Sequence, residues 1–340
     1  MFKFRTSTKI RIYSEFPRFL SGVFSIRRRC VILGWRTLCV KDSERIRLKL
    51  DNIEIIKNGR EVYVPLSDIE SIILEGQDTT ISTRLLAKLS KNHIMLIVCD
   101  QKYLPAGIFL EYGQYHRSAK RVKKQLQWTD DLMRRAWQQI VSQKIINQIK
   151  FAHYLEVDHS RLELMNSLLE ELQPGDPTNR EGHAAKVYFN SIYGNEFSRE
   201  LDCIENMAMN FGYTIIRSYI ARAVVANGLI TARGLFHTNE YNQFNLVDDL
   251  MEPFRPLVDY WIHTQVLDDK IDHLTYEKRL KIIDIVNQPM LTNDGKKSTL
   301  DLVINRYIND FITAMNNNNL AMLYTIDLND FIAANEKVKG

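Results

Sequence analysis

The hydrophobic period of this 340-residue chain changes once along its length, and that change constrains its fold more than any other feature. From Arg36 to about Leu110, short apolar runs alternate with polar residues or are rich in β-branched residues, as in strands. From His116 onward, apolar residues recur at helical spacing. The sequence therefore predicts an α+β multidomain protein: a small N-terminal β-sheet domain followed by a larger all-α C-terminal domain.

The first region, residues 34–112, contains a series of strand signals. Asn58-Gly59 separates the runs IEIIK and REVYVPL, which predicts a type I′ hairpin. The runs IESIILEG and HIMLIVCD are continuously apolar, as in buried strands. Between them, ISTRLLAKLSKN has helical spacing, with Ser82 or Thr83 as its N-cap. We expect a β-sheet domain with one helix.

The second region, residues 116–328, reads as helical throughout. Its longest amphipathic stretch covers 120–151, and Trp128 and Trp137 are expected in the core. A clear break follows at 173–177, where two prolines flank Gly175. Further helices are predicted over 162–172, 180–193, 203–227, 246–264, 276–285 and 298–314.

A basic extension, residues 1–33, precedes both regions. Residues 1–31 carry eight Lys or Arg and one acid, a net charge of +7, so −3 of the formal +4 remains for residues 32–340. The pI therefore gives no argument that the body of the protein binds nucleic acid. The extension resembles a targeting peptide or a DNA-binding arm. Pro17 and Gly22 interrupt any amphipathic period, which favours a third hypothesis: translation begins near Leu33, and the extension is not part of the functional protein.

The cysteines and the hydropathy bound the cellular setting. The spacing of Cys30, Cys39, Cys99 and Cys203 fits neither a zinc site nor a disulfide framework, so reduced buried thiols in a cytoplasmic protein are expected. No apolar run approaches the roughly 20 residues needed to cross a bilayer, so no membrane partner is expected.

The chemistry concentrates between Gly234 and residue 259, in GLFHTNEYNQFNLVDDLMEPFRPLVD. His237 lies in a polar, Asn-rich stretch, and a predicted helix follows. The carboxylates of that helix, Asp248, Glu252 and Asp259, recur at i, i+4 and i+11 and lie near one face. A histidine beside such a face can bind Mg²⁺ or Mn²⁺.

Two neighbouring features qualify this hypothesis. Asp249 and Glu252 would lie close at i, i+3, while Pro253 and Pro256 predict that the helix is kinked or restarts there. The best candidate for a third ligand is Glu181, which opens the segment REGHAAKVYF. A carboxylate in a first helical turn also favours the helix dipole, so Glu181 alone has a purely structural explanation. A lone histidine such as His237 is also more often a surface or core residue than a ligand.

A basic cluster opens the second region. Five basic residues fall within eight positions: Arg117, Lys120, Arg121, Lys123 and Lys124. They form either a solvated helix face or a stripe that contacts DNA phosphates with salt-dependent affinity. The density of charge favours the phosphate-contacting stripe.

Together these segments resemble the CRISPR-associated integrase, the larger subunit of the spacer-acquisition complex. The resemblance covers Gly34 to about residue 327 and rests on GWRT, REGHAAKVYFNSIYG, MNFGY and FHTNEYNQFNLVDDLMEPFRPLVD. The last segment is similar to the type II branch of the family. The family begins near Gly34, so the basic extension departs from it.

The resemblance implies a metal-dependent DNA integrase and endonuclease with Mg²⁺ or Mn²⁺ as cofactor. Glu181, His237 and Glu252 fall on its catalytic, metal-ligand positions, and Asp249 falls on a supporting acidic position. His237 would bind metal, transfer protons, or do both. Two further residues would contact phosphates near the metal, Lys186 and Arg255. Short foreign DNA fragments would be inserted into a CRISPR array as their 3′-hydroxyls attack repeat phosphodiesters.

The resemblance also implies partners: double-stranded DNA, a homodimer joined through the β-domain, and a small ferredoxin-like protein that bridges two dimers into a heterohexamer. Two other hypotheses stay open. One is a metal-dependent nuclease that cuts branched DNA without a CRISPR role. The other is a DNA-binding scaffold with a degenerate site, although all three ligand positions hold competent residues.

Overall fold

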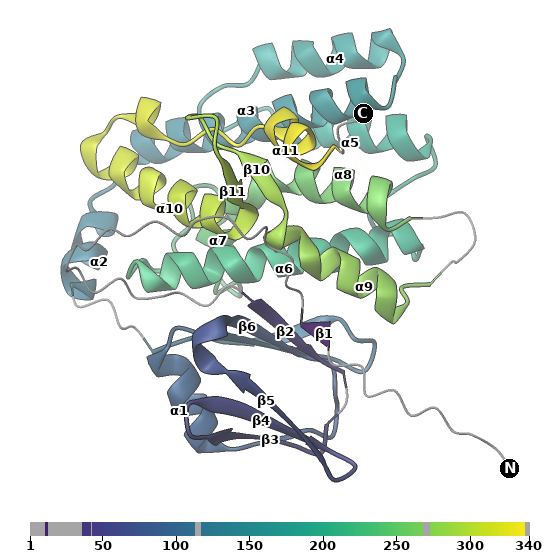
Figure 1. The fold of residues 1–340 in the computed structure, drawn as a ribbon. Coiled ribbons are helices and arrows are strands. Elements are labelled where there is room, and N and C mark those ends of the chain that lie inside the picture. Colours follow the sequence, from purple (N-terminus) through teal and green to yellow (C-terminus); the bar gives the residue numbers. More distant parts are fainter. Residues whose placement is uncertain (1–10, 13–35, 42, 113–116, 268–272, 337–340) are drawn as a thin grey trace, which may run out of the picture. The chain divides into compact units, whose positions relative to one another are not determined.

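A computed structural model describes residues 11–12, 36–41, 43–112, 117–267 and 273–336 (Figure 1). The chain divides into two compact units between Tyr112 and Gly113, a β-rich unit and a helical unit. This arrangement confirms the predicted α+β fold class. The basic extension lies outside the described residues, apart from the strand Arg11–Ile12.

The β-rich unit holds two sheets that share one core. In the five-stranded sheet, β2, β6 and β8 run parallel, and β1 and β9 pair antiparallel at its two edges. In the four-stranded sheet, β3, β4 and β5 form an antiparallel meander, and β7 pairs parallel with β3. The strands in spatial order are β1 (Arg11–Ile12), β2 (Arg36–Val40), β6 (Ile69–Leu74), β8 (Met95–Cys99) and β9 (Pro105–Phe109), then β5 (Arg60–Pro65), β4 (Asn52–Lys57), β3 (Arg45–Lys49) and β7 (Thr80–Ile81).

The apolar faces of both sheets and helix α1 (Thr83–Lys91) enclose this core. Its members include Leu38 of β2, Ile53 of β4 and Leu89 of α1. The predicted turn chemistry is confirmed: Asn58 and Gly59 adopt φ of 49° and 70° between β4 and β5, and Ser82 caps α1.

The helical unit departs from prediction at its start. The stretch predicted as one amphipathic helix over 120–151 is two helices, α2 (Ser118–Leu126) and α3 (Asp130–Tyr154). The break follows from capping, because the side chain of Thr129 accepts a hydrogen bond from the Leu132 amide and starts α3 anew. Trp128 and Trp137 are buried, as predicted.

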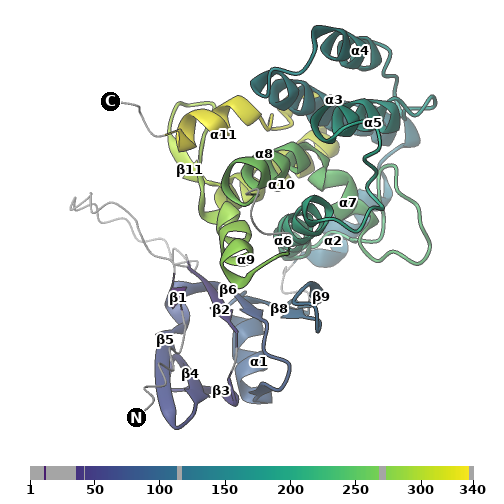
Figure 2. The same cartoon turned by 90° about the vertical axis from the view of Figure 1, so that its right-hand side faces the viewer.

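The remaining helices pack around α3 and α6 (Figure 2). α3 contacts α4, α5 and α8, whereas α6 contacts α7 to α10. A short hairpin, β10–β11, adds to the helical unit and was not predicted. The elements are α4 (His159–Glu170), α5 (Arg180–Tyr193), α6 (Ile204–Ala226), α7 (Asn245–Met251), η2 (Glu252–Phe254), α8 (Arg255–Gln265), α9 (Tyr276–Ile283), η3 (Asp284–Asn287), β10 (Pro289–Leu291), β11 (Lys297–Thr299), α10 (Leu300–Asn317), η4 (Leu320–Met322) and α11 (Leu328–Asn335).

The helix predicted over 246–264 does restart where its prolines indicated. α7 ends at Met251, η2 spans Glu252–Phe254, and α8 begins at Arg255. Asn147 of α3, which is buried, donates a hydrogen bond to the Pro253 carbonyl at 3.2 Å. The break therefore turns the backbone at Glu252 while a buried amide holds it against α3.

The cysteines and the apolar helices bear on two further expectations. Cys39 and Cys99 are buried, Cys203 is half-buried, and Cys30 lies outside the described residues. Among the helices that the structure describes, none is long and apolar enough to cross a membrane.

Candidate active site

A cavity of about 260 Å³ lies in the helical unit. Four of the residues singled out in the sequence, Glu181, His237, Glu252 and Arg255, line it together. They come from α5, the loop after α6, η2 and α8, so the fold gathers distant segments at one place. The other lining residues are Trp137, Lys144, Gln148, Phe189, Arg199, Tyr213 and Asp259.

His237 is held by a fully buried carboxylate. Its Nδ1 lies 2.6 Å from Oδ1 of Asp249, and Oδ1 also accepts the His237 amide. The other oxygen, Oδ2, accepts the amides of Leu235 and Phe236. Because a carboxylate only accepts hydrogen bonds, Nδ1 carries the proton and Nε2 is the ring nitrogen left to act. The hydrogen bond from His237 to Asp249 also raises the pKa of the imidazole.

The backbone around His237 requires a glycine. A Cβ at Gly234 would lie 2.3 Å from the His237 carbonyl oxygen and 2.7 Å from Asp249 Oδ2. Asn245 ties the loop further by donating to the carbonyls of Ala232 and Asn239. The imidazole is therefore placed by a built loop, and its ring meets Trp137 edge-on at 5.6 Å.

Glu252 lies at the helix break and is 4% exposed. Its Oε1 accepts a hydrogen bond from Arg255 Nε at 2.8 Å, and its Oε2 forms an ion pair with Lys144 of α3. Burial acts to raise the pKa of Glu252, but the two cations outweigh it and lower the pKa to about 2. Glu252 is therefore ionised at neutral pH.

Glu181 lies in the first turn of α5, as predicted, and its carboxylate forms an ion pair with the same Lys144. The turn is fixed by Asp176, whose carboxylate accepts the amides of Arg180 and Glu181 at 2.7 and 2.9 Å. One ammonium group thus joins the two predicted glutamate ligands.

A third buried carboxylate, Asp259, also lines the cavity. It accepts hydrogen bonds from the hydroxyls of Tyr188 at 3.0 Å and Tyr213 at 2.5 Å. Burial raises the pKa of Asp259 to about 6, although both hydroxyls oppose the rise. Asp259 thus differs from Glu252, which is ionised because cations contact it.

Two guanidinium groups flank Tyr213. Arg255 lies 4.6 Å and Arg199 5.3 Å from the centre of its ring. Arg199 also donates to Asn206 and Asn210 of α6, which fixes its position in the wall. Planar guanidinium groups bind phosphate well, so this side of the cavity suits an anionic substrate.

The donor set fits a hard divalent cation in its chemistry: two carboxylates, and an imidazole whose second nitrogen is held by a carboxylate. Among the described residues, no three His, Cys, Asp or Glu side chains lie close enough to hold a metal ion. Instead, Lys144 supplies the positive charge between Glu181 and Glu252. The glutamates therefore already bind a cation, but it belongs to the chain.

Several predicted residues lie elsewhere. Asp248 does not face the cavity with Glu252, because Arg217 of α6 binds both of its oxygens at 2.5 and 2.9 Å. Lys186 is exposed on α5 and does not line the cavity. The expectation that Asp248 lies beside Glu252 at the site is therefore wrong, whereas the phosphate contact expected of Lys186 stays a prediction.

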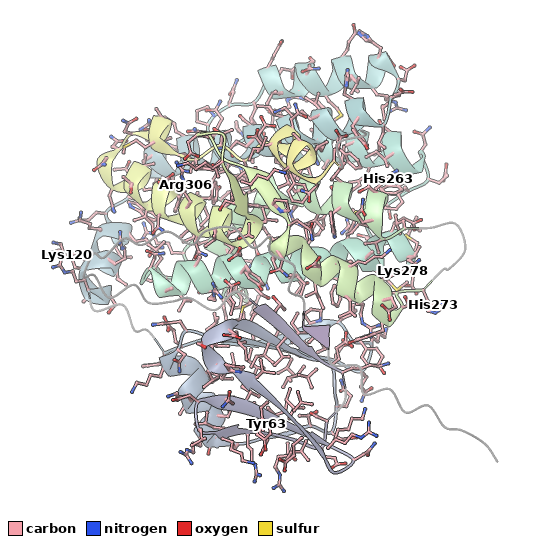
Figure 3. All side chains as sticks on the ribbon, in the orientation of Figure 1. Tyr63, Lys120, His263, His273, Lys278 and Arg306 are labelled. Atoms are coloured by element: carbon pink, nitrogen blue, oxygen red, sulfur yellow. The ribbon has the colours of Figure 1, made fainter. Side chains whose placement is uncertain are left out.

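The predicted basic stripe lies on the surface of α2. Figure 3 labels Lys120 there, at the edge of the helical unit. Arg121 is half-buried, and the other four basic residues are exposed: Arg117, Lys120, Lys123 and Lys124. None of the five lines the cavity, so the stripe is a separate surface feature.

Sequence reasoning missed Lys144, Arg199 and Tyr213, whereas Asp259, which it placed on one carboxylate face with Glu252, does line the cavity. A signal for Lys144 was present in KIINQIK, where Lys144, Asn147 and Gln148 interrupt an apolar helix face. Buried polar residues on such a face require partners. No comparable local signal marks Arg199, which lies between helices.

The fold and cavity define the class: an α+β protein of two units with a carboxylate–imidazole–arginine site suited to phosphate ester chemistry. Residues 38–303 match the family described as CRISPR associated protein Cas1. The chain therefore belongs to the Cas1 family, which confirms the family indicated by its motifs.

Curated relatives agree with this assignment. The CRISPR-associated endonuclease Cas1 of Neisseria meningitidis serogroup C (strain 8013) is 40% identical over 227 residues, which are 67% of this chain and 74% of the relative. CRISPR-associated endonuclease Cas1 1 of Francisella tularensis subsp. novicida (strain U112) is 24% identical over 284 residues, 75% of this chain and 87% of the relative.

Solved structures share the fold. A CAS1 protein from Thermotoga maritima has a TM-score of 0.67 at 18% identity, covering 82% of this chain and 96% of its own. A casposase bound to integration product has a TM-score of 0.68 at 17% identity, and the match covers 86% of this chain and 92% of the casposase chain. A Cas6-RT-Cas1–Cas2 complex has a TM-score of 0.69 at 19% identity; the match covers 92% of this chain but only 38% of that longer chain.

Proposed function

We propose that this protein is a metal-dependent DNA integrase and endonuclease of CRISPR adaptation, acting in the bacterial cytoplasm and belonging to the type II branch. Short foreign DNA fragments would be its substrates, and repeat phosphodiesters in a CRISPR array its targets. The observation that carries the proposal is the convergence of Glu181, Glu252 and the Asp249-held His237 in one cavity with Arg255. The names of the curated endonuclease relatives and of the casposase support it.

The reaction is a transesterification. The 3′-oxygen of a fragment forms a bond to a repeat phosphorus as one existing P–O bond of the repeat breaks. The hydroxyl proton leaves the nucleophile, and the departing 3′-oxygen gains one, so atoms and charge balance. The nucleophile comes from DNA, and no covalent protein–DNA intermediate is needed.

The chain's residues divide this work. Nε2 of His237 is the atom for either of its two roles, ligand or proton acceptor, because Asp249 occupies Nδ1. Arg199 and Arg255 also line the cavity and provide positive charge for the phosphate oxygens of a bound DNA. Glu181, Glu252 and His237 would hold the Mg²⁺ or Mn²⁺, which would neutralise phosphate charge and polarise the reacting oxygens.

DNA outside the cavity would contact the exposed stripe of α2 through its phosphates. We also propose the assembly that the family resemblance implies: a homodimer joined through the β-rich unit, bridged by a small ferredoxin-like partner. The Cas1–Cas2 composition of a structural neighbour supports a partner of this kind.

Strand joining tests the proposal directly. The full chain and its small partner are mixed with a supercoiled plasmid that carries the repeat and with short duplex DNA bearing free 3′-hydroxyls. Joining is expected with Mn²⁺, none with EDTA, and none with His237→Ala. His159→Ala changes an exposed histidine on α4 and serves as the control, which should retain joining.

Two other outcomes would replace the proposal. Metal-dependent cleavage of branched DNA without joining would establish the nuclease alternative. Binding of DNA without any metal-dependent chemistry would favour the hypothesis of a DNA-binding scaffold with a degenerate site. Retention of full joining by His237→Ala would refute the assigned site even if the integrase activity held.

A further inference from the structure

Lys144 lies between the two glutamates of the cavity and belongs to neither of their helices. It projects from α3, the helix against which α5 and η2 both pack. Its ammonium forms ion pairs with Glu181 and Glu252, and its side chain is only 8% exposed. A buried lysine that joins two carboxylates from separate elements holds those elements at one point.

The charges at this point are balanced without any added ion. Glu181 and Glu252 contribute two negative charges, and Lys144 and Arg255 contribute two positive ones. A divalent cation added to this set would leave an excess of two positive charges. If Lys144 withdraws, the excess falls to one, which a DNA phosphate neutralises.

The ammonium and a divalent cation would also compete for the same atoms. Carboxylate oxygens are the ligands that Mg²⁺ and Mn²⁺ prefer. The oxygens contacted by Lys144, Oε1 of Glu181 and Oε2 of Glu252, are the ones that face each other across it. The other oxygen of Glu252 is held by Arg255.

We infer that Lys144 is an internal counter-ion of this site. In the metal-free protein its ammonium keeps Glu181 and Glu252 together in the place that the divalent cation takes, and metal binding displaces it. The inference rests on the proposed function, because it concerns the metal of the same site. The long, flexible stem of lysine lets the ammonium move into the adjoining cavity while α3 stays in place.

Lys144→Met removes the charge and keeps the length of the side chain. In EDTA, the melting temperature of the full chain should fall by about 5 to 10 °C, because the buried Glu252 and the half-buried Glu181 lose a shared cation. Saturating Mn²⁺ should restore it nearly to the wild-type value. Mn²⁺, titrated by the electron paramagnetic resonance of the free ion, should bind the variant about 10-fold more tightly than wild type, because the competitor is gone.

Lys150→Met is the matched control. Lys150 lies on the same helix and pairs with Asp327 at 2.6 Å, but it does not line the cavity. Its replacement should leave both the Mn²⁺ affinity and the effect of Mn²⁺ on the melting temperature as in wild type.

A double variant provides a second test in case Lys144→Met folds poorly. Lys144→Met with Glu181→Gln removes one charge of each sign, so its melting temperature in EDTA should exceed that of Lys144→Met and approach wild type. Its Mn²⁺ affinity should not show the gain, because a ligand is lost. A double variant as unstable as the single one would identify Lys144 as a structural strut and overturn the inference.

Failure of the inference and failure of the proposed metal site give different results. If wild type binds Mn²⁺ and Glu252→Gln does not, but Lys144→Met binds it no more tightly than wild type, the site holds and the counter-ion role is wrong. If wild type and Glu252→Gln bind Mn²⁺ equally or not at all, the metal site itself is wrong, and the inference falls with it.

Discussion

Two buried glutamates in this protein have the same electrostatic state for different reasons. Glu54 of the β-rich unit and Glu252 of the helical unit each contact two cations, and each has its pKa lowered to about 2. At Glu54 the hydrogen bond from Arg47 is the largest cause. At Glu252 burial is the largest influence and acts in the opposite direction, so the cations must overcome it.

The partners of the two glutamates also differ in origin. Arg47 and Tyr63 lie directly opposite Glu54 on neighbouring strands, so strand register alone brings them together. Figure 3 labels Tyr63 on this sheet. The cations of Glu54 are 40% and 47% exposed and reach water. Lys144 reaches Glu252 only through tertiary packing. Both lysines are shared with a second carboxylate, but Glu61 beside Lys49 is 44% exposed, whereas Lys144 is only 8% exposed between Glu181 and Glu252. The two sites therefore differ in burial of the shared cation, and the exchange proposed for Lys144 belongs to the buried one.

The sharpest way to break the comparison is Glu252→Gln. We expect strand joining to fall about 10³-fold, because an amide cannot supply the negative charge that holds a divalent cation at the reacting phosphate. Initial rates of joining at saturating Mn²⁺ would measure it. A loss of less than 10-fold would mean that Glu252 serves stability, as Glu54 does.

Asp249→Asn is expected to have the next largest effect, a fall of about 100-fold in joining. Four donors converge on this carboxylate, and an amide offers only one accepting atom, so the imidazole of His237 loses its orientation. Asp248→Asn is the control, since Asp248 pairs with Arg217 away from the cavity. Equal losses in both variants would show that the loop, and not the imidazole, is being disturbed.

The sequence predicted the change from strands to helices, the hairpin at Asn58-Gly59 and the helix break at Glu252. These succeeded because each depends on local chemistry: hydrophobic period, turn residues and proline. Local signals were also overlooked. Thr129-Asp130 marks the start of α3, and the turn of the β10–β11 hairpin contains Asp294-Gly295, with Gly295 at φ +74°.

The site could be predicted only in part, because some of its residues are brought together by tertiary packing and carry no local signal. Glu181, His237 and Glu252 lie in motifs, whereas the roles of Lys144 and Arg199 depend on which side chains meet them after folding. Spacing along one helix also misassigned Asp248, because Arg217 of another helix draws it away. Periodicity gives the face of an element, but it does not give the partner across it.

Asp259 extends the comparison to a buried carboxylate whose hydrogen bonds come from two hydroxyl groups, those of Tyr188 and Tyr213. Its pKa of about 6 in the folded protein exceeds the ordinary 3.8, so the folded state binds the proton more tightly. This contribution to stability is therefore full below about pH 4 and is lost as pH rises through about 6. Across this pH range, the free energy of unfolding of wild type should fall by about 3 kcal/mol more than that of Asp259→Asn. Urea unfolding of both proteins from pH 4 to 7 measures the difference, and parallel curves would contradict it.

The basic stripe of α2 represents the fully solvated extreme of the comparison. Replacing Lys120, Lys123 and Lys124 with alanine should make the slope of log K for DNA against log salt shallower by about 3, at roughly 0.9 per phosphate contact. Filter binding between 50 and 200 mM salt would measure the slope. Lys296→Ala, at an exposed position that is 80% accessible, is the control and should leave it unchanged. An unchanged slope in the triple variant would make the stripe a solvated face without DNA contacts.

The smallest effect is expected from Glu54→Gln, and it completes the comparison. The amide oxygen can still accept from Tyr63 and Lys49, and the released Arg47 is 40% exposed and returns to water, so the melting temperature should fall by no more than a few degrees. Mn²⁺ should not change that shift, and joining should proceed as in wild type. Differential scanning fluorimetry in EDTA and in Mn²⁺ would measure the two melting temperatures. A metal-dependent shift at Glu54 would show that a lysine shared by two carboxylates suffices for metal exchange even where it is exposed, and that the burial of Lys144 is not what makes the cavity a site.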